Sequence, residues 1–287
     1  MSELEVLETG PLSLIQDLGR PGYLSSGVGV SGAADRGSAK LANRLVGNGE
    51  NSACIEVLMG GLALRAPQVT IVAVTGAPAT ALLDGIPMGH ASVIVMQPGQ
   101  TLRLQYAHVG LRSYVGVRGG VAVPDVLGSR STDTLSGIGP EALKPNDVLP
   151  VGSAATKFPN VDVAPVPPMD AGTLSVRVIA GPRDDWFTNP EALTTGVWAV
   201  SPDTDRIGAR LNRHGDSPAL VRTSEAELPT EGVALGSIQV PPSGQPVVFL
   251  ADHPISGGYP VIGVVADEDI DRIAQARPGQ LIRFTTA

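Results

Sequence analysis

Apolar and β-branched residues gather in short runs along most of the chain, and glycine- and proline-rich turns separate these runs about every eight to twelve residues. Val69–Val74, Ser92–Met96 and Gln245–Leu250 are three clear examples. Short strands at this spacing are typical of a β-sandwich or β-barrel. Because glycine and proline suit turns and are disfavoured inside helices, we expect a mainly β protein.

Only a few segments have the spacing of a helix. A cap at Ser31 or Asp35 and a stop at Gly47–Asn48 bracket a stretch in which apolar residues recur on one face. These residues are Ala39, Ala42, Leu45 and Val46. Asp267–Ala276 has a similar apolar stripe, with acidic residues in its first turn. A third, shorter helix is expected to begin at Asn189–Glu191, because proline suits the first helical position.

One sequence pattern occurs more than once. Gln97–Leu104 and Arg277–Phe284 share a Pro-Gly-Gln turn followed by alternating residues, and Lys144–Val151 is a weaker third copy. This pattern indicates one structural unit used repeatedly, the alternative being that Pro-Gly-Gln is simply a frequent turn. Prolines crowd the segment 158–169, so we expect a linker at 153–172. It would join β domains at residues 1–152 and 173–287.

Composition and charge narrow the class of protein. Of 287 residues, 43% are apolar and 17% charged, so the chain has enough hydrophobic surface for a core. The net charge of −8, without a basic face, argues against nucleic acid as a partner. The acidic start Met1–Glu5 does not resemble a secretory signal, and Gly76 and Pro78 interrupt the longest apolar stretch. We expect a soluble, cytoplasmic protein that does not bind membranes.

Several kinds of site are not expected. The sequence contains no Gly-x-Ser-x-Gly elbow, Walker loop, His-Glu-x-x-His pair or biotin-type Met-Lys-Met sequence. Cys54 is the only cysteine, and its apolar neighbours predict a buried, inert thiol. No metal site is expected, since none of the four histidines has a partner at metal spacing; they are His90, His108, His214 and His253.

Four polar clusters lie in glycine-rich sequence, where a simple core would not need them. They are Gln16–Tyr23, Gly128–Asp133, Ser201–Gly208 and Ala251–Pro260. Three of the four place an arginine within four residues of an aspartate. Such a pair fits a structural ion pair at the rim of a barrel, and it fits equally well a clamp for a carboxylate ligand. The residues alone leave both interpretations open.

The motifs in these clusters and around them resemble those of the KipA-like family. The matching residues are Gly10–Tyr23, Ser31-Gly32 with Asp35, Leu41–Asn48, Val126–Asp133, Gly232–Pro242, and Asp252 with Gly257–Pro260. The family is also named after the C subunit of 5-oxoprolinase, as allophanate hydrolase subunit 2, or as the biotin-dependent carboxyltransferase family. The resemblance runs in order along nearly the whole chain, and it implies two cyclophilin-like β-barrel domains with a few short helices.

The resemblance also implies a function. Bacterial members work with a KipI-like B subunit and with an A subunit as an ATP-dependent 5-oxoprolinase that opens 5-oxoproline to L-glutamate. In this hypothesis the assembled complex uses ATP, and the chain is inactive alone. One alternative is a carboxyltransferase component that moves a carboxyl group from carboxybiotin to urea or a similar amide, with biotin not attached to this chain. Another is a non-catalytic, KipI-binding regulator.

The expected mechanism assigns provisional roles to the residues of the clusters. A lactam is resonance-stabilised, so it needs an activated carbonyl, and phosphorylation of its oxygen would leave two anions to hold. The proposed orienting or proton-transfer residues are Asp17, Asp133, Asp205 and Asp252. The proposed substrate- and anion-binding residues are Gln16, Arg20, Ser31, Arg130, Ser131, Thr132, Arg206, Glu231, Gln239, Gly257, Gly258 and Tyr259.

Two loops depart from the family pattern. His253–Ser256 stands where many members have Arg-Gln-Thr-Thr, and Pro229–Glu231 stands where a Ser-Glu pair is common. A histidine at position 253 would make anion binding there pH-dependent.

Overall fold

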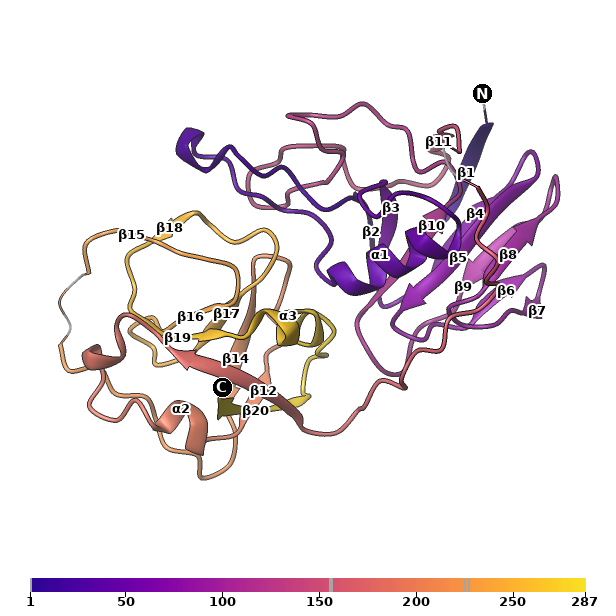
Figure 1. Ribbon diagram of the computed structural model, residues 1–287. Helices are drawn as coiled ribbons and strands as arrows, with labels where there is room; N and C mark the ends of the chain where they lie inside the picture. The colour runs from indigo at the N-terminus through magenta and orange to yellow at the C-terminus, as the bar shows by residue number, and fades with distance from the viewer. Residues whose placement is uncertain (1, 155–156, 225, 227) are drawn as a thin grey trace. The chain divides into compact units, whose positions relative to one another are not determined.

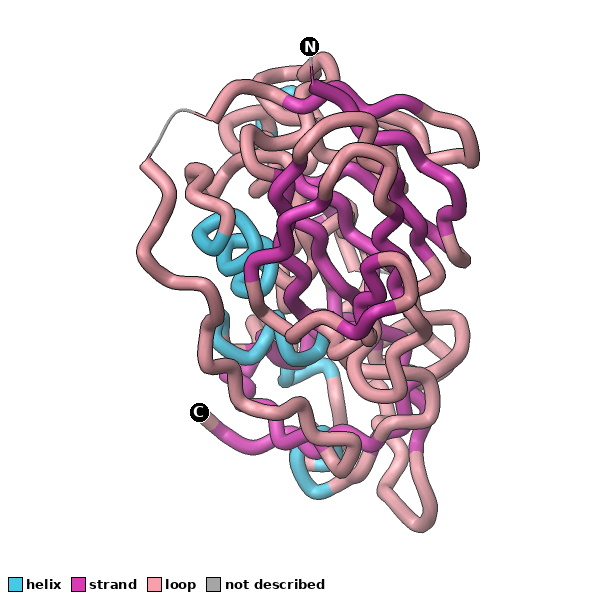
Figure 2. The backbone as a smooth tube through the Cα atoms, turned by 90° about the vertical axis from the view of Figure 1, so that its right-hand side faces the viewer, coloured by secondary structure: helices cyan, strands magenta, loops and turns pink. Residues whose placement is uncertain are grey.

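The computed structural model describes residues 2–154, 157–224, 226 and 228–287, which form two compact units (Figure 1). Unit 1 contains residues 1–20 and 31–169, and unit 2 contains residues 21–30 and 170–287. Strands outnumber helices in both units, and Figure 2 shows far more strand than helix along the chain, which confirms the prediction of a mainly β fold with a few short helices. Residues 155 and 156 of the expected linker lie outside the described residues, and the expected domain boundaries stay a prediction.

Unit 1 is built from two antiparallel sheets that share one core. The six-stranded sheet has the order β11 (Val148–Val151), β1 (Ser2–Thr9), β4 (Leu62–Arg65), β9 (Thr101–Leu104), β6 (Ala81–Leu83) and β7 (Ile86–Pro87). The five-stranded sheet has the order β2 (Leu12–Gln16), β3 (Cys54–Leu58), β10 (Arg112–Val117), β5 (Thr70–Gly76) and β8 (Val93–Met96). Side chains of both sheets, such as Leu64 and Val115, are buried in the same hydrophobic cluster.

The helix α1 (Arg36–Leu45) covers the outer face of the five-stranded sheet (Figure 1). Asp35, one of the two caps that the sequence allows, accepts a hydrogen bond from the backbone N–H of Ser38 at 2.8 Å. The helix lies so close to β10 that a Cβ atom at Gly116 would come within 2.8 Å of the Ala42 backbone. Because α1 covers one face and the core the other, every residue of β10 is buried.

Unit 2 contains a closed barrel. Its strand order is β12 (Leu174–Ala180), β19 (Val261–Val265), β16 (Ser237–Gln239), β17 (Val247–Phe249), β14 (Gly208–Arg213), β13 (Trp198–Val200) and β20 (Leu281–Thr286). A parallel pairing between β20 and β12 closes the ring, which removes exposed sheet edges. Large buried side chains fill it, with Trp198 and Phe284 each about 1% exposed.

Unit 2 also contains several short elements besides the barrel strands. They are the helices α2 (Ala192–Thr195) and α3 (Asp267–Ala274), the 3₁₀ turns η1 (Leu24–Ser26) and η2 (Asp184–Trp186), and the paired strands β15 (Glu231–Gly232) and β18 (Ser256–Gly257). The helix predicted at 267–276 is confirmed. The predicted start, with Pro190 as the first helical residue, is two residues too early, since α2 begins at Ala192; the helix makes only one turn.

The repeated sequence pattern folds into one repeated turn. In the first copy the Gln97 backbone N–H donates to the Gln100 side-chain oxygen at 2.8 Å, and in the second Arg277 donates to Gln280 at 3.2 Å. The weaker third copy substitutes a carboxylate, because Lys144 donates to Asp147 at 2.8 Å. A strand follows each turn, namely β9, β20 and β11. The turn and the strand after it therefore recur, as both a reused unit and a frequent turn predict.

Part of the proline-rich segment adds to the open edge of β8. The Val93 N–H donates to the Asp162 carbonyl and the Ala164 N–H to the Ala91 carbonyl, both at 2.8 Å. Upstream, the guanidinium of Arg118 lies over the Phe158 ring at 5.0 Å from its centre. We call residues 158–164 the edge segment. These contacts attach it to unit 1, in the pairing geometry that a proline-containing chain can adopt at a sheet edge.

Candidate functional site

The carboxylate of Asp17 organises the polar cluster of unit 1. One of its oxygens accepts hydrogen bonds from the Gly19 N–H at 2.8 Å and the Ser129 hydroxyl at 2.6 Å. The other accepts from the Arg130 N–H at 2.6 Å. These bonds tie the loop after β2 to the segment Gly128–Asp133, which lies more than one hundred residues later in the chain. Asp17 is buried, and its geometry is that of a group that positions two loops.

Two further side chains of the first loop reach the same segment. Gln16 donates from Nε2 to the Thr132 carbonyl at 2.9 Å, and Arg20 donates from Nη2 to the Ser131 carbonyl. Both side chains are fully buried, at 0% and 1% exposure. Within the part of the chain that the structure describes, Gln16 Oε1 and the Nε and Nη1 atoms of Arg20 have no hydrogen-bond partner. Buried polar groups in this state are rare in folded proteins.

The loop Ser31–Asp35 completes this cluster. The Ser31 hydroxyl donates to the Thr132 carbonyl at 3.3 Å, and the Ala33 N–H donates to the Asp17 carbonyl at 2.8 Å. Gly32 has a φ of +96°, and a Cβ there would lie 2.7 Å from the Leu18 backbone, so this close approach requires glycine.

A buried hydrogen-bond network, which the sequence did not reveal, also holds the loop Ser31–Asp35 in place. Glu56 accepts from the Ala34 N–H at 3.0 Å and from the Tyr114 hydroxyl at 2.8 Å. The same hydroxyl accepts from the Asp35 N–H at 2.8 Å, and Arg112 lies 3.7 Å from Glu56. Burial and the neighbouring Glu56 charge raise the pKa of Tyr114, so it stays a neutral donor. In the sequence, the sign of this network is a glutamate and a tyrosine in two strands, β3 and β10, that pair opposite each other in the folded chain.

The other predicted residues of unit 1 have local partners. The Thr132 hydroxyl donates to the Pro140 carbonyl at 2.9 Å, and Ser131 shares a hydrogen bond with Ser129 at 2.7 Å between their hydroxyls. Arg130 donates from Nε to the Val123 carbonyl at 2.6 Å. Asp133 accepts from the Leu135 N–H at 2.9 Å and so closes a turn.

In unit 2, Arg206 and Asp252 face each other as an ion pair. Nε lies 2.8 Å from Oδ2, and Nη2 lies 3.0 Å from Oδ1. Asp205 is exposed, and its Oδ1 accepts from the Ile207 and Gly208 N–H groups at 2.8 and 3.0 Å. His253 points its Nδ1 at the Pro254 carbonyl, 2.7 Å away.

The remaining predicted residues of unit 2 gather near the paired strands β15 and β18. Gln239 donates to the Tyr259 carbonyl at 2.9 Å, and it passes Gly257 so closely that a Cβ there would lie 2.5 Å from its Nε2. Glu231, which pairs with Gly257 in the sheet, forms an ion pair with Arg183, and the second bond of that pair measures 3.1 Å. The hydrogen bond from Arg183 lowers the pKa of Glu231. Arg183 was missed by the sequence analysis, because no motif marks it.

The predicted site residues thus form two groups. Unit 1 brings together Gln16, Asp17, Arg20, Ser31, Arg130, Ser131, Thr132 and Asp133, and unit 2 holds Asp205, Arg206, Glu231, Gln239, Asp252, Gly257, Gly258 and Tyr259. Of the two groups, the one in unit 1 is the better candidate for a binding site. Its Arg20 is a buried guanidinium with N–H donors that lack partners among the described residues, and the unit 2 group contains no such residue. Their catalytic and binding roles stay predictions.

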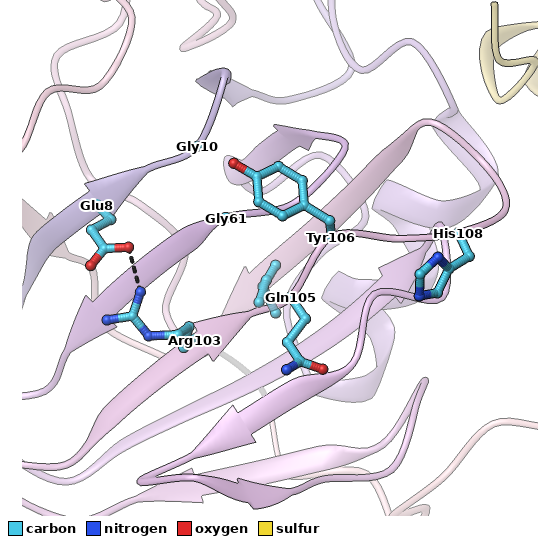
Figure 3. A pocket seen from close by; sticks show the side chains of 8 residues that line it. Glu8, Gly10, Gly61, Arg103, Gln105, Tyr106 and His108 are labelled. Carbon is cyan, nitrogen blue, oxygen red and sulfur yellow. Dashed lines mark hydrogen bonds and ion pairs between the residues drawn. The ribbon is translucent and has the colours of Figure 1, made fainter.

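A surface pocket of unit 1 is lined by none of these residues. It is lined by Glu8, Gly10, Gly61, Arg103, Leu104, Gln105, Tyr106 and His108 (Figure 3). Glu8 and Arg103 point toward each other across one side of it and form an ion pair. Both side chains of this pair are about half exposed, so the pair contributes little energy. The pocket holds no buried polar group that lacks a partner in the described chain.

Two other observations bear on the chemistry. Cys54 is buried as predicted, and burial followed by the nearby Glu56 and Asp17 charges raises the pKa of its thiol. Among the described residues, no three His, Cys, Asp or Glu side chains gather as metal ligands, and no helix has the length and apolar character needed to cross a bilayer.

Comparisons with known proteins agree with this architecture. Residues 26–286 match the family described as carboxyltransferase domain, subdomain A and B. The chain is 35% identical over 286 residues to the C subunit of 5-oxoprolinase from Escherichia coli strain K12, in a match that covers 98% of this chain and 90% of that protein.

Two solved structures extend the comparison. The crystal structure of TTHA0988 superposes with a TM-score of 0.89 at 34% identity, covering 100% of this chain and 56% of that one. The urea carboxylase of Kluyveromyces lactis superposes with a TM-score of 0.89 at 30% identity, covering 99% of this chain and 27% of that one. The chain therefore spans about half or less of these two longer proteins. With a family match over nearly its whole length, the chain belongs to the family of carboxyltransferase domains with subdomains A and B.

Proposed function

We propose that the chain is the C subunit of a 5-oxoprolinase that has several subunits and depends on ATP. In this proposal it works with a KipI-like B subunit and with an A subunit to open 5-oxoproline to L-glutamate. The observation that carries the proposal is the match to a protein named as the C subunit of 5-oxoprolinase, because it covers 90% of that relative and 98% of this chain. A match of that extent supports the same arrangement of domains in this chain and in that relative.

The unit 1 cluster supports a role in holding the substrate. Opening a lactam requires a group that withdraws electrons from its carbonyl, and phosphorylation by ATP supplies such a group in the assembled complex. Arg20 presents buried N–H donors without protein partners among the described residues, which suits an oxygen of the substrate or of its phosphorylated form. Arg130 already donates to Val123, so we give it a smaller part in binding.

Asp17 has a positioning role in this proposal. It accepts three hydrogen bonds, from Gly19, Ser129 and Arg130, and these keep Arg20 and the Ser131–Thr132 carbonyls in place. Because both of its oxygens are already engaged by these donors, Asp17 holds the two loops together and leaves contact with the substrate to Arg20.

A carboxyltransferase component is the second candidate. The family match and the likeness to a urea carboxylase favour it. Biotin would then be attached outside these 287 residues, because they contain no Met-Lys-Met attachment sequence. A binding-only regulator of a KipI-like protein is the third candidate, and it would need none of the buried donors.

Reconstitution separates the three candidates. Glutamate release from 5-oxoproline and ATP is measured with all three subunits and with each one left out. Release only from the complete set supports the proposal. Transfer from free carboxybiotin to urea, without glutamate release, would support the second candidate instead. A stable complex whose activity is unaffected by Arg20→Met would support the third.

A further inference from the structure

Three polar side chains stand in one row across the five-stranded sheet, beneath α1. The register places Glu56 of β3 opposite Tyr114 of β10, and Tyr114 opposite Thr75 of β5, so all three point to the same face. They are buried, at 4%, 0% and 1% exposure, and we call them the polar row. At one end of the row, the Thr75 hydroxyl donates to the Ser38 carbonyl of α1 at 2.7 Å.

The other two members of the polar row hold the end of the loop Ser31–Asp35. Because a backbone N–H can only donate, the Tyr114 hydroxyl accepts from Asp35 and gives its single proton to Glu56, with both bonds at 2.8 Å. The same Glu56 oxygen, Oε2, also accepts from the Ala34 N–H at 3.0 Å. The direction of each bond is therefore fixed, and loss of the Tyr114 hydroxyl would break two of the three.

The middle of this loop lies against the backbone that leads to Arg20. The Ala33 N–H donates to the Asp17 carbonyl at 2.8 Å. A Cβ atom at Gly32 would come within 2.8 Å of the Gly19 nitrogen, so the two backbones are in direct contact. A shift of the loop would therefore displace the backbone next to Arg20.

The start of the loop has a conformation that needs such support. Ser31 has a φ of +56°, in the left-handed region that non-glycine residues rarely adopt. A conformation of this kind persists where the surrounding contacts hold it. The hydroxyl of Ser31 donates to the Thr132 carbonyl at 3.3 Å on one side, and the polar row holds the following residues on the other.

We propose that Tyr114 is a positioning residue, which places Arg20 for substrate binding through the loop Ser31–Asp35. Its hydroxyl sets the position of the loop, and the loop sets the position of the backbone that precedes Arg20. Tyr114 itself does not touch the substrate. The inference rests on the proposed function in taking Arg20 as a residue that binds the substrate.

A double-mutant cycle in the reconstituted complex tests this route. Tyr114→Phe should lower kcat/KM for glutamate release about tenfold, because a small misplacement near a site is costly. In the Arg20→Met background the same substitution should change kcat/KM by less than about twofold, since no guanidinium is left to be positioned.

Ser113→Ala provides a matched control on the same strand. Ser113 precedes Tyr114 in β10, and its buried hydroxyl donates to the Ala77 carbonyl at 2.9 Å on the opposite face of the sheet. Both substitutions remove a buried hydrogen bond and should lower the melting temperature. Only Tyr114→Phe should lower kcat/KM by more than about twofold.

The purified chain gives a readout that needs no other subunit. In NMR spectra the Arg20 Nε–H signal should shift in Tyr114→Phe, and the Ala33 amide should exchange about tenfold faster. Both quantities should keep their wild-type values in Ser113→Ala.

A second variant serves if Tyr114→Phe does not fold. Glu56→Gln disturbs the same row, because its amide nitrogen would face the Arg112 guanidinium, whose Nε lies 3.7 Å from Glu56 Oε1. It should lower kcat/KM and move the Arg20 signal in the same way.

The possible results separate this inference from the proposed function. Equal losses of kcat/KM in the wild-type and Arg20→Met backgrounds would overturn the inference, because Tyr114 would then act by another route. A lower melting temperature with unchanged kcat/KM and an unmoved Arg20 signal would make Tyr114 purely structural and keep the proposed function. A wild-type complex that releases no glutamate, with an Arg20 signal that still moves in Tyr114→Phe, would reject the proposed function and keep the positioning.

Discussion

Arg206 presents the Nε and Nη2 edge of its guanidinium to both oxygens of Asp252, at 2.8 and 3.0 Å. The two side chains are 4% and 0% exposed, so the pair is removed from water. This carboxylate occupies one of the guanidinium edges that can bind a carboxylate through two N–H groups. For this pair the geometry favours the structural ion pair over the ligand clamp, the two interpretations that the sequence left open.

Replacing Arg206 by alanine should destabilise unit 2 strongly. The free energy of unfolding should fall by about 3–5 kcal/mol, because Asp252 would remain as a buried charge without its partner. The double variant Arg206→Met, Asp252→Leu should recover much of the loss. Urea unfolding followed by the fluorescence of Trp198 measures both. An Arg206→Ala chain as stable as the wild type would show that the pair does not brace the barrel.

Asp17→Asn should loosen the loop around Ser129. Both oxygens of Asp17 accept hydrogen bonds, so an amide nitrogen at either position would face a donor such as the Arg130 N–H. The expected loss is about 1–3 kcal/mol of unfolding free energy, with faster amide exchange at Arg130. The exposed Asp125 offers a matched control in the same unit, since Asp125→Asn should change stability by less than about 0.5 kcal/mol. Equal effects of the two substitutions would contradict the assignment.

The substitution Arg20→Met should lower activity without lowering stability. Removing a buried charge that lacks a counterion in the described chain removes an unfavourable term, while the methionine side chain keeps most of the packing. The melting temperature should stay unchanged or rise, and glutamate release by the reconstituted complex should fall at least about a hundredfold. A large drop in melting temperature would mean that Arg20 is needed chiefly for folding.

Asp269 should make unit 2 sensitive to acid. Burial opposes its ionisation, but hydrogen bonds from Arg177 and Arg272 outweigh burial and lower its pKa from 3.8 to about 2. Stability from this group is therefore present above pH 4 and is lost as the pH falls toward 2. The contribution is about 1–2 kcal/mol, allowing for the half-exposed arginines.

The test compares Asp269→Asn with the wild type in chemical unfolding between pH 6 and 2. The variant should be less stable at pH 6, and the difference should shrink at the acidic end. A difference that does not change with pH would mean that the carboxylate charge contributes nothing. Glu268→Gln is a suitable control, because that side chain lies on the same helix and is largely exposed.

The sequence predicted those features of the fold that depend on neighbouring residues. The Asp35 cap, the apolar stripe of α1 and the repeated Gln97–Gln100 turn each involve groups three or four positions apart. The third helix was expected to be short, and Thr194, Thr195 and Gly196 end α2 just after it begins; its start at Ala192 was not predicted.

The site was only partly predictable for the same reason. Motifs marked Asp17 and Arg206, but their partners lie 112 and 46 positions away, at Ser129 and Asp252. Only the folded chain shows that one arginine meets a carboxylate while another meets a carbonyl. The sequence did not mark Glu56 and Tyr114, because the alternating pattern of a strand is the same whether its buried residues pack in a core or join a hydrogen-bond network.

The edge segment also bears on how unit 1 meets other molecules. By pairing with Ser92 and its neighbours it occupies backbone groups of β8 that would otherwise be open to another strand. Truncation before Phe158 would therefore leave a ready template for strand addition by a second molecule. We therefore expect the truncated chain to associate with itself more readily and to be less soluble than the full chain.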